Sequence, residues 1–184
     1  VLVRDVSFSL RAGESLVLIG ETGSGKTMAA LSLMKLLPSN VRMNGGTIRF
    51  LGEDLLKRKN IRALLGQDIV YIPQSGLECL NPSETVRRQM YSNLRKLNTP
   101  IARLEHETLE HLSAAGFPEP EAVVGRYPFQ LSGGMAQRVT IALALCSNAK
   151  LIIADEPTNG LGEKATAGFV SLLDSLFPEA AKLV

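Results

Sequence analysis

This 184-residue chain lacks the features that mark membrane-spanning, nucleic-acid-binding and disulfide-rich proteins. Although 45% of its residues are hydrophobic, no apolar run approaches the ~18 to 20 residues that a membrane span requires. Its 20 basic and 18 acidic residues nearly cancel, so no nucleic-acid partner is expected. The two cysteines, Cys79 and Cys146, are far apart and have no paired spacing, which indicates neither a zinc site nor a disulfide framework. We therefore expect a protein of the reducing cytoplasm.

Both ends of the sequence look cut. The chain begins at Val1 without an initiator methionine or a signal-peptide pattern, and it stops in the apolar run EAAKLV, which is typical of the beginning of a strand. A length of 184 residues nevertheless suits one domain with a substantial core. We expect residues 1–184 to form a single domain that is truncated at both ends.

The segment GETGSGKT carries the strongest chemical signal. A candidate buried strand, SLVLIG, runs into it, and KTMAALSLMKLL then has the composition of a helix with no breaker until Pro38. Glycines have no Cβ, so the loop can point its backbone N–H groups inward beside the positive end of the helix dipole. The spacing predicts that Lys26 binds the β- and γ-phosphates of a nucleotide and that the Thr27 hydroxyl binds Mg²⁺. The simpler alternative is a flexible glycine-rich turn.

Two carboxylates, Asp155 and Glu156, follow the apolar strand KLIIA. The last side chains of a parallel strand meet the ligand crevice, next to the phosphate loop. One carboxylate can then support Mg²⁺ while its neighbour polarises a water for attack on the γ-phosphate. An acidic turn after a buried strand is the alternative.

A third pattern, LSGGMAQRVTIALAL, places Ser132, Gly133 and Gly134 before a predicted helix. A serine and two bare backbone units at a helix N-terminus again form a candidate anion site. The alternative is a serine N-cap that follows a flexible Gly-Gly pair. The sequence thus predicts two anion sites but only one pair of catalytic carboxylates.

The strands predicted outside these motifs are of two kinds. Alternation of Val6, Phe8 and Leu10 predicts antiparallel structure that turns at RAGE and leads into a parallel core. GGTIRFLGEDL predicts a short strand after a glycine turn, and DIVYIPQ predicts a strand that ends before Gln74.

A helical insertion follows these strands. Between residues 85 and 115 the sequence has helical periodicity. His106 and His111 lie in this stretch, five residues apart, so they share no helix face well and we expect exposed surface instead of metal ligands. The expected division is a nucleotide-binding core of residues 1–84 and 147–184 and a helical subdomain of residues 85–146 that carries LSGG.

In this order, GETGSGKT, Gln74 after an apolar strand, LSGGMAQRV and LIIADEPT closely resemble the ATP-binding subunit of an ABC transporter, over essentially the whole chain. LNPSETV and GRYPFQLSGGMAQRVTIALAL are most similar to the dipeptide, oligopeptide and nickel importer ATPases. The resemblance implies an α/β fold, namely a P-loop NTPase (RecA-like) with a parallel-sheet core, an antiparallel β flank and a helical insertion. It also implies ATP and Mg²⁺ as cofactors.

The resemblance further implies roles for particular residues. Glu156 would be the general base, Lys26 and Gln74 would act with it, and Thr27, Gln74 and Asp155 would surround Mg²⁺. In this family two ATPase subunits pack head to tail, so that the Ser-Gly-Gly of one closes over the γ-phosphate held by the other. The residues implied to contact nucleotide are Gly20, Glu21, Thr22, Gly23, Ser24, Gly25, Lys26, Thr27 and Met28 and, from the opposite subunit, Ser132, Gly133, Gly134 and Gln137.

The loop after DEPT departs from the family pattern. The family usually has an aspartate there that couples the two sites, whereas this chain has Gly162, which favours a heterodimer with a related ATPase. The family's adenine-stacking aromatic and γ-phosphate histidine are expected before Val1 and after Val184. The resemblance implies an ATPase that powers solute import at the cytoplasmic face of the inner membrane, bound to integral membrane permease subunits. Two alternatives stay open: a non-transport ABC ATPase, and a hydrolysis-impaired regulatory subunit.

Overall fold

The computed structural model describes residues 3–21, 23–157 and 163–184. Its centre is a four-stranded sheet in the order β1-β6-β5-β4, in which every neighbouring pair is parallel. Parallel strands that are covered on both faces are almost continuously apolar, as LIIA in β5 is. All three residues of β6 are buried as well, including the charged Lys182. The four strands are β1 (Ser15–Leu16), β4 (Ile69–Ile72), β5 (Leu151–Ala154) and β6 (Ala181–Leu183).

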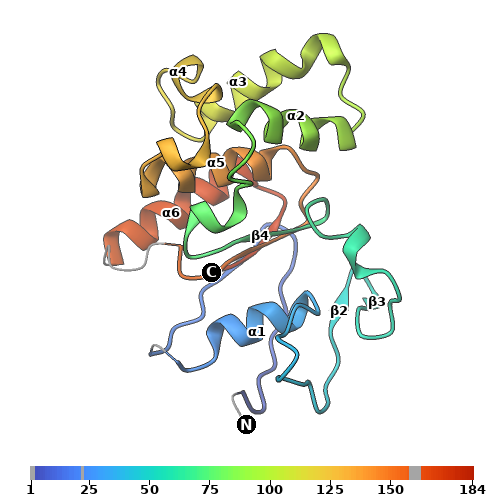
Figure 1. Ribbon diagram of the computed structural model, residues 1–184. Helices are drawn as coiled ribbons and strands as arrows, with labels where there is room; N and C mark the ends of the chain where they lie inside the picture. Colours follow the sequence, from blue (N-terminus) through green and yellow to red (C-terminus); the bar gives the residue numbers. More distant parts are fainter. Residues whose placement is uncertain (1–2, 22, 158–162) are drawn as a thin grey trace.

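The helices lie at both ends of the molecule and against the sheet (Figure 1). The α2, α3 and α4 helices gather at one end, whereas α1 and the β2–β3 pair lie at the other (Figure 1). The long helices have bounds α1 (Lys26–Leu33), α2 (Val86–Lys96), α3 (Leu104–Ala114), α5 (Gly133–Leu145) and α6 (Glu163–Leu176), and the short α4 spans Glu121–Val124. No helix among the described residues is both long enough and apolar enough to cross a membrane.

Two hydrophobic clusters lie on opposite faces of the sheet. Ile152 belongs to the cluster formed with α2, α3, α5 and α6, whereas its neighbour Ile153 belongs to the cluster formed with α1. Successive residues of a strand point to opposite faces, so β5 contributes to both clusters. The helical residues therefore share one core with the sheet, and the division into residues 1–84 with 147–184 and residues 85–146 stays a prediction.

The structure confirms the helical insertion and changes one detail of it. Leu104, Thr108 and Leu112 are buried on one face of α3, as the periodicity predicts. His106 is exposed, but the prediction of an exposed His111 is wrong. The ring Nδ1 of His111 lies 3.3 Å from the Sγ of Cys146 on α5, and burial lowers the pKa of this histidine.

The prediction of antiparallel structure through Val6, Phe8 and Leu10 is also wrong. Residues 3–14 form no strand, and the side chains of Val6 and Phe8 are 55% and 42% exposed. Alternation in sequence makes a strand only where a neighbouring strand pairs with its backbone, and among the described residues no strand pairs with residues 3–14. The SLVLIG strand is shorter than expected, although Leu18 N–H still donates to the Val184 carbonyl at 2.7 Å.

The antiparallel flank is instead a small hairpin of β2 (Arg49–Phe50) and β3 (Glu53–Asp54). Its two turn residues, Leu51 and Gly52, both have positive φ, 49° and 84°. Two central residues of this kind make the tight two-residue turn that suits the twist of paired strands. GGTIRFLGEDL therefore supplies a pair of strands where we predicted one.

Candidate functional site

The glycine-rich loop that leads into helix α1 contains two glycines in the left-handed region. Gly23 and Gly25 have φ values of 85° and 98°, in the left-handed region that favours glycine. Gly25 is the N-cap of α1 and provides no side-chain cap. The first N–H groups of a helix have no partner within the helix, so the start of α1 offers donors and a positive dipole end to an anion. Thr22 lies outside the described residues.

The side chain of Lys26 reaches back over this loop. Its Nζ lies 2.6 Å from the Gly20 carbonyl oxygen and 3.1 Å from that of Glu21. It also forms an ion pair with Glu156, whose Oε1 lies 2.9 Å away. The two side chains are 17% and 28% exposed, so the pair is largely shielded from water. The loop and the end of β5 are therefore joined by a charge contact that the sequence did not predict.

Asp155 is buried at the end of β5 and accepts two hydrogen bonds. The Thr27 hydroxyl donates to its Oδ1 at 3.1 Å, and the Tyr71 hydroxyl donates to its Oδ2 at 3.0 Å. Burial raises the pKa of Tyr71 and the negative charge of Asp155 raises it further, so the phenol stays protonated and remains a donor. Sequence reasoning missed Tyr71; its only signal was a hydroxyl within the apolar strand DIVYI.

The Thr27 and Asp155 oxygens fit the donor set of Mg²⁺, which prefers hydroxyl and carboxylate oxygen. Thr27 lies in α1 and Asp155 directly follows β5, and the hydroxyl-to-carboxylate hydrogen bond places their oxygens side by side. No group of three or more His, Cys, Asp or Glu side chains in the described part of the chain forms a metal cluster. A Mg²⁺ held here would therefore need the oxygens of its substrate or water to complete its shell.

Glu156 has an unusual backbone conformation. Its φ is +44°, in the left-handed region that costs a non-glycine residue roughly 1 to 3 kcal/mol. Such strain persists where the surrounding contacts hold the residue in place, and here the Lys26 ion pair is one of them. The conformation turns the carboxylate toward the phosphate loop.

Gln74 follows β4 on the same edge of the sheet. Ile72 pairs with Ala154, and the Asp155 N–H donates to the Ile72 carbonyl at 2.9 Å. The chain therefore leaves β4 toward Gln74 beside the point where it leaves β5 toward Asp155. Gln74 is exposed, and no described hydrogen bond joins it to the other site residues. Its metal and catalytic roles stay predictions.

The second candidate anion site is the start of α5. The Met135 N–H donates to the Ser132 hydroxyl at 3.3 Å, so Ser132 is an N-cap, which is the simpler alternative for this motif, and its role in anion binding stays a prediction. Gly133 and Gly134 are exposed, and a Cβ added at either would meet no atom within 4 Å. No hydrogen bond or ion pair of the described residues links this helix start to Lys26, Thr27 or the carboxylates. Within one chain the two anion sites are therefore separate.

Gln137 differs from its neighbours at the start of α5. Its side-chain Nε2 is buried and has no hydrogen-bond partner among the described residues. The role of Gln137 in nucleotide contact stays a prediction.

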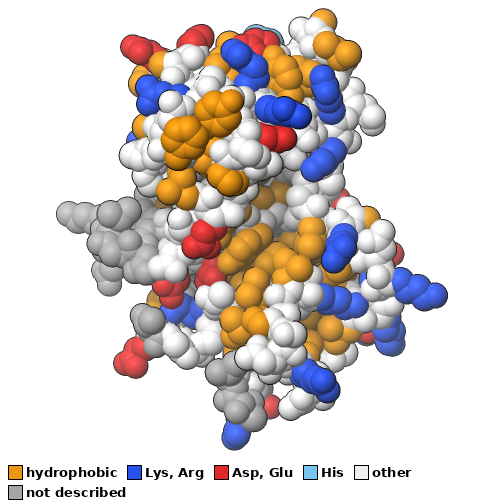
Figure 2. All heavy atoms as spheres, viewed as in Figure 1, with side chains coloured by type: hydrophobic (Ala, Val, Ile, Leu, Met, Phe, Trp, Pro, Cys, Tyr) orange, Lys and Arg blue, Asp and Glu red, His pale blue; other side chains and the backbone are white. Residues whose placement is uncertain are grey.

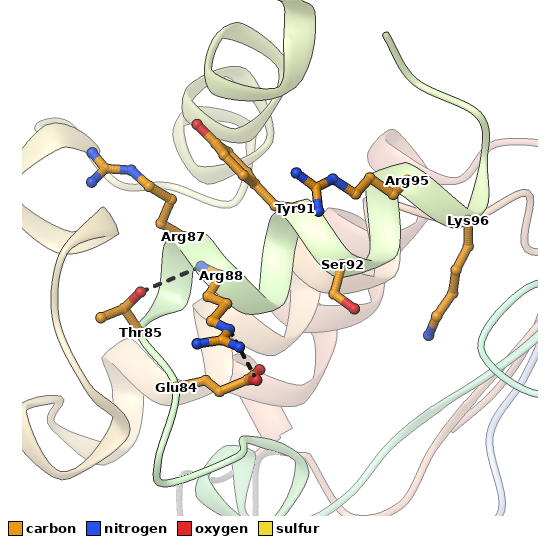
Figure 3. A pocket seen from close by; sticks show the side chains of 8 residues that line it. All are labelled: Glu84, Thr85, Arg87, Arg88, Tyr91, Ser92, Arg95 and Lys96. Atoms are coloured by element: carbon orange, nitrogen blue, oxygen red, sulfur yellow. Dashed lines mark hydrogen bonds and ion pairs between the residues drawn. The ribbon is translucent and has the colours of Figure 1, made fainter. Parts of the chain in front are cut away.

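A shallow groove lies elsewhere, along α2 (Figure 3). Its volume is about 590 Å³ and its walls are mostly charged or polar, unlike the apolar pockets that enclose small ligands. Lys and Arg side chains gather over this part of the surface (Figure 2). Arg88 forms an i,i+4 ion pair with Glu84 at 3.2 Å, at the start of α2. The lining residues are Glu84, Thr85, Arg87, Arg88, Tyr91, Ser92, Arg95 and Lys96.

Comparison with known sequences agrees with the motifs. The sequence profile of the family described as "ABC transporter" matches residues 3–159. The peptidoglycan transport ATP-binding protein YejF of Agrobacterium fabrum is 42% identical over 181 residues, which are 96% of this chain and 33% of that protein. The dipeptide transport ATP-binding protein DppD of Haemophilus influenzae is 40% identical over 172 residues, which are 91% of this chain and 52% of that protein. The chain thus spans a third to about half of the length of these relatives.

A solved structure has the same fold. The dimeric ATP-binding cassette MJ0796, in a post-hydrolysis state with ADP and Pi, superposes with a TM-score of 0.82 at 24% identity. The match covers 100% of this chain and 79% of that one. At this identity the likeness establishes the α/β cassette fold that the sequence predicts.

Proposed function

This chain belongs to the ABC transporter family, and we propose that it is the ATP-hydrolysing subunit that powers solute import through a partner membrane permease. The observation that carries the proposal is a pair of contacts between the start of α1 and the residues after β5: Lys26 pairs with Glu156, and Thr27 donates to Asp155. A phosphate-binding loop that touches two carboxylates is the arrangement that nucleotide hydrolysis requires.

The residues of the cluster divide the chemistry among them. The N–H groups at the start of α1 and the Lys26 ammonium would bind the β- and γ-phosphates, and Thr27 and Asp155 would hold Mg²⁺, which would supply charge neutralisation at the phosphate oxygens. Glu156 would accept the proton of the attacking water at a carboxylate oxygen, and Gln74 would orient that water. The water oxygen then bonds to the γ-phosphorus as the bond from that phosphorus to the bridging oxygen breaks, and ADP and phosphate leave.

The start of α5 has a role in a second subunit. This helix start is exposed to solvent and carries no charged side chain at Ser132, Gly133 or Gly134. The N–H groups at a helix N-terminus of this kind can complete a phosphate site on another molecule, where the charge of the phosphate is already neutralised. We propose that two ATPase subunits close head to tail on ATP, each offering this helix start to the γ-phosphate of the other.

The partners and the cargo are part of the same proposal. The named relatives are peptidoglycan and dipeptide transport ATP-binding proteins, which favours a peptide-type solute. A nickel-type solute rests on the resemblance of the motifs alone. A permease would hold the subunit at the cytoplasmic face of the inner membrane. The second ATPase would be a related chain, because Gly162 replaces the usual coupling aspartate; Gly162 lies outside the described residues.

The test is to purify the whole protein from its native cells by an affinity tag and identify what comes with it. We expect a permease, a second ATPase and MgATP hydrolysis by the complex. Recovery without a permease would favour a non-transport ATPase, and a complex that binds but does not hydrolyse MgATP would favour a regulatory subunit. An active complex that holds two copies of this chain and no second ATPase would contradict the heterodimer.

A further inference from the structure

The short 3₁₀ helix η2 (Gly76–Cys79) lies directly against α5. A Cβ added at Gly76 would lie 2.5 Å from the Gln137 backbone nitrogen and 2.6 Å from the Ala136 carbonyl carbon. No real Cβ approaches backbone atoms so closely, and backbone cannot rotate away as a flexible side chain can. Gly76 is not among the residues with positive φ, so the close approach requires glycine at this position.

A buried hydroxyl joins the same two segments. Thr140 is 5% exposed, and its Oγ1 lies 3.3 Å from the Gly76 carbonyl oxygen and 3.0 Å from that of Ala136. Thr140 lies one turn after Ala136 in α5. The Thr140 hydroxyl bonds to the Gly76 carbonyl, and the Cα of Gly76 packs against Ala136 and Gln137, so η2 contacts α5 at two adjacent points. We call this set of Gly76, Ala136, Gln137 and Thr140 the 76–136 contact.

The 76–136 contact connects two parts of the proposed machinery. Gly76 comes two residues after Gln74, and Ala136 comes four residues after Ser132. The Ala136 N–H donates to the Ser132 carbonyl at 2.8 Å, so the contact acts on the first turn of α5. The segment that carries Gln74 is therefore packed without a gap against the helix start that carries Ser132.

We propose that Gly76 is a positioning residue: its contact with α5 makes the Gln74 segment and Ser132–Gly134 move as one body. The position of the helix start offered to the second subunit is then set by the segment that follows β4. Interiors are close-packed, so a displacement at one side of such a contact is passed to the other. This inference rests on the proposed function, which assigns Ser132–Gly134 to the partner's nucleotide.

The test separates nucleotide binding by one subunit from closure of two. Gly76→Ala is made in the whole protein together with Glu156→Gln, which retains bound MgATP. The matched control is Gly125→Ala, because Gly125 has φ −85° and a Cβ there would meet no atom within 4 Å. MgATP affinity is measured by titration at protein concentrations that keep the subunits apart, and ATP-driven association is measured by analytical ultracentrifugation.

We expect Gly76→Ala to weaken ATP-driven association about 10- to 100-fold, because a methyl group forced into a packed contact shifts α5. MgATP affinity should stay within about twofold, because the phosphate loop does not touch η2 in any described hydrogen bond. Gly125→Ala should match the parent in both measurements. A loss of nucleotide affinity equal to the loss of association would overturn the inference, since it would reveal general damage to the fold.

A second pair of variants keeps the test decisive if Gly76→Ala does not fold. Thr140→Val removes the hydroxyl at nearly constant volume and should weaken association about two- to tenfold, whereas Thr140→Ser keeps the hydroxyl and should match the parent. If Gly76→Ala and Thr140→Val both associated as tightly as the parent, this inference alone would be overturned. A parent that does not associate on MgATP would overturn the proposed function, and this inference with it.

Discussion

The two helix starts that can bind an anion differ in their surroundings. The start of α1 is charged: a lysine crosses it and pairs with Glu156, and a threonine beside it contacts Asp155. The start of α5 is open and uncharged, with a serine N-cap and two exposed glycines. A site with its own charged groups can hold a ligand by itself, whereas an uncharged helix start contributes only when a ligand is brought to it. The difference teaches that similar glycine-rich motifs can have opposite roles.

The largest expected effect tests the charged site at the start of α1. Glu156→Gln should slow ATP hydrolysis by about 10²- to 10⁴-fold while MgATP still binds, because an amide does not accept the proton of the attacking water. Phosphate release and equilibrium titration measure the two quantities. Glu110→Gln, on the exposed side of α3, is the control and should hydrolyse ATP at the parental rate. Parental turnover in Glu156→Gln would show that the general base lies elsewhere.

Replacing Lys26 sharpens the comparison, because it removes the positive charge at the start of α1. Lys26→Ala should weaken MgATP binding about 10- to 100-fold, since hydrogen bonds to charged groups contribute ~1.5 to 3 kcal/mol. Lys57→Ala is the matched control, because Lys57 is 86% exposed and its only described ion pair is to Asp54 at 3.7 Å. Titration with MgATP should separate the two variants. Equal affinities would mean that the loop amides alone bind the phosphates.

The start of α5 is tested by comparing two N-caps whose capping hydrogen bonds have the same length. Ser132 caps α5 and Thr85 caps α2, each through a hydroxyl that accepts an N–H at 3.3 Å. Replacing either by alanine should cost ~1 kcal/mol of unfolding free energy. Only Ser132→Ala should also lower turnover of the assembled complex, by about tenfold, with MgATP affinity of the separate subunit unchanged. If Thr85→Ala lowered turnover as much, Ser132 would be a structural cap and nothing more.

The smallest effect concerns the residue behind Asp155. Tyr71→Phe removes one hydrogen bond to this buried carboxylate and should weaken Mg²⁺-dependent ATP binding about fivefold, which corresponds to ~1 kcal/mol. Tyr91→Phe is the control, because Tyr91 donates in the same way to Glu105 but belongs to the helical end of the molecule. Affinities measured at several Mg²⁺ concentrations should separate the variants. Equal Mg²⁺ dependence would remove Tyr71 from the site.

Local features of the fold and the site were predictable from the sequence, whereas contacts between segments far apart in the sequence were not. The loop and its helix follow from glycine spacing and apolar periodicity within a dozen residues. Lys26 and Glu156 meet across 130 positions, and no pattern in either segment encodes their ion pair. The strand predicted through Val6 and Phe8 failed for the same reason, since a strand depends on a partner that the local sequence does not name.

The Lys26–Glu156 ion pair joins the two side chains that the proposed function assigns to opposite steps, phosphate binding and proton transfer. While the lysine ammonium lies 2.9 Å from the carboxylate, each group is engaged by the other. Under the proposed function, a triphosphate that enters the loop would compete for the same ammonium and would release the carboxylate of Glu156. Arrival of the substrate would then free the side chain that has to meet the attacking water.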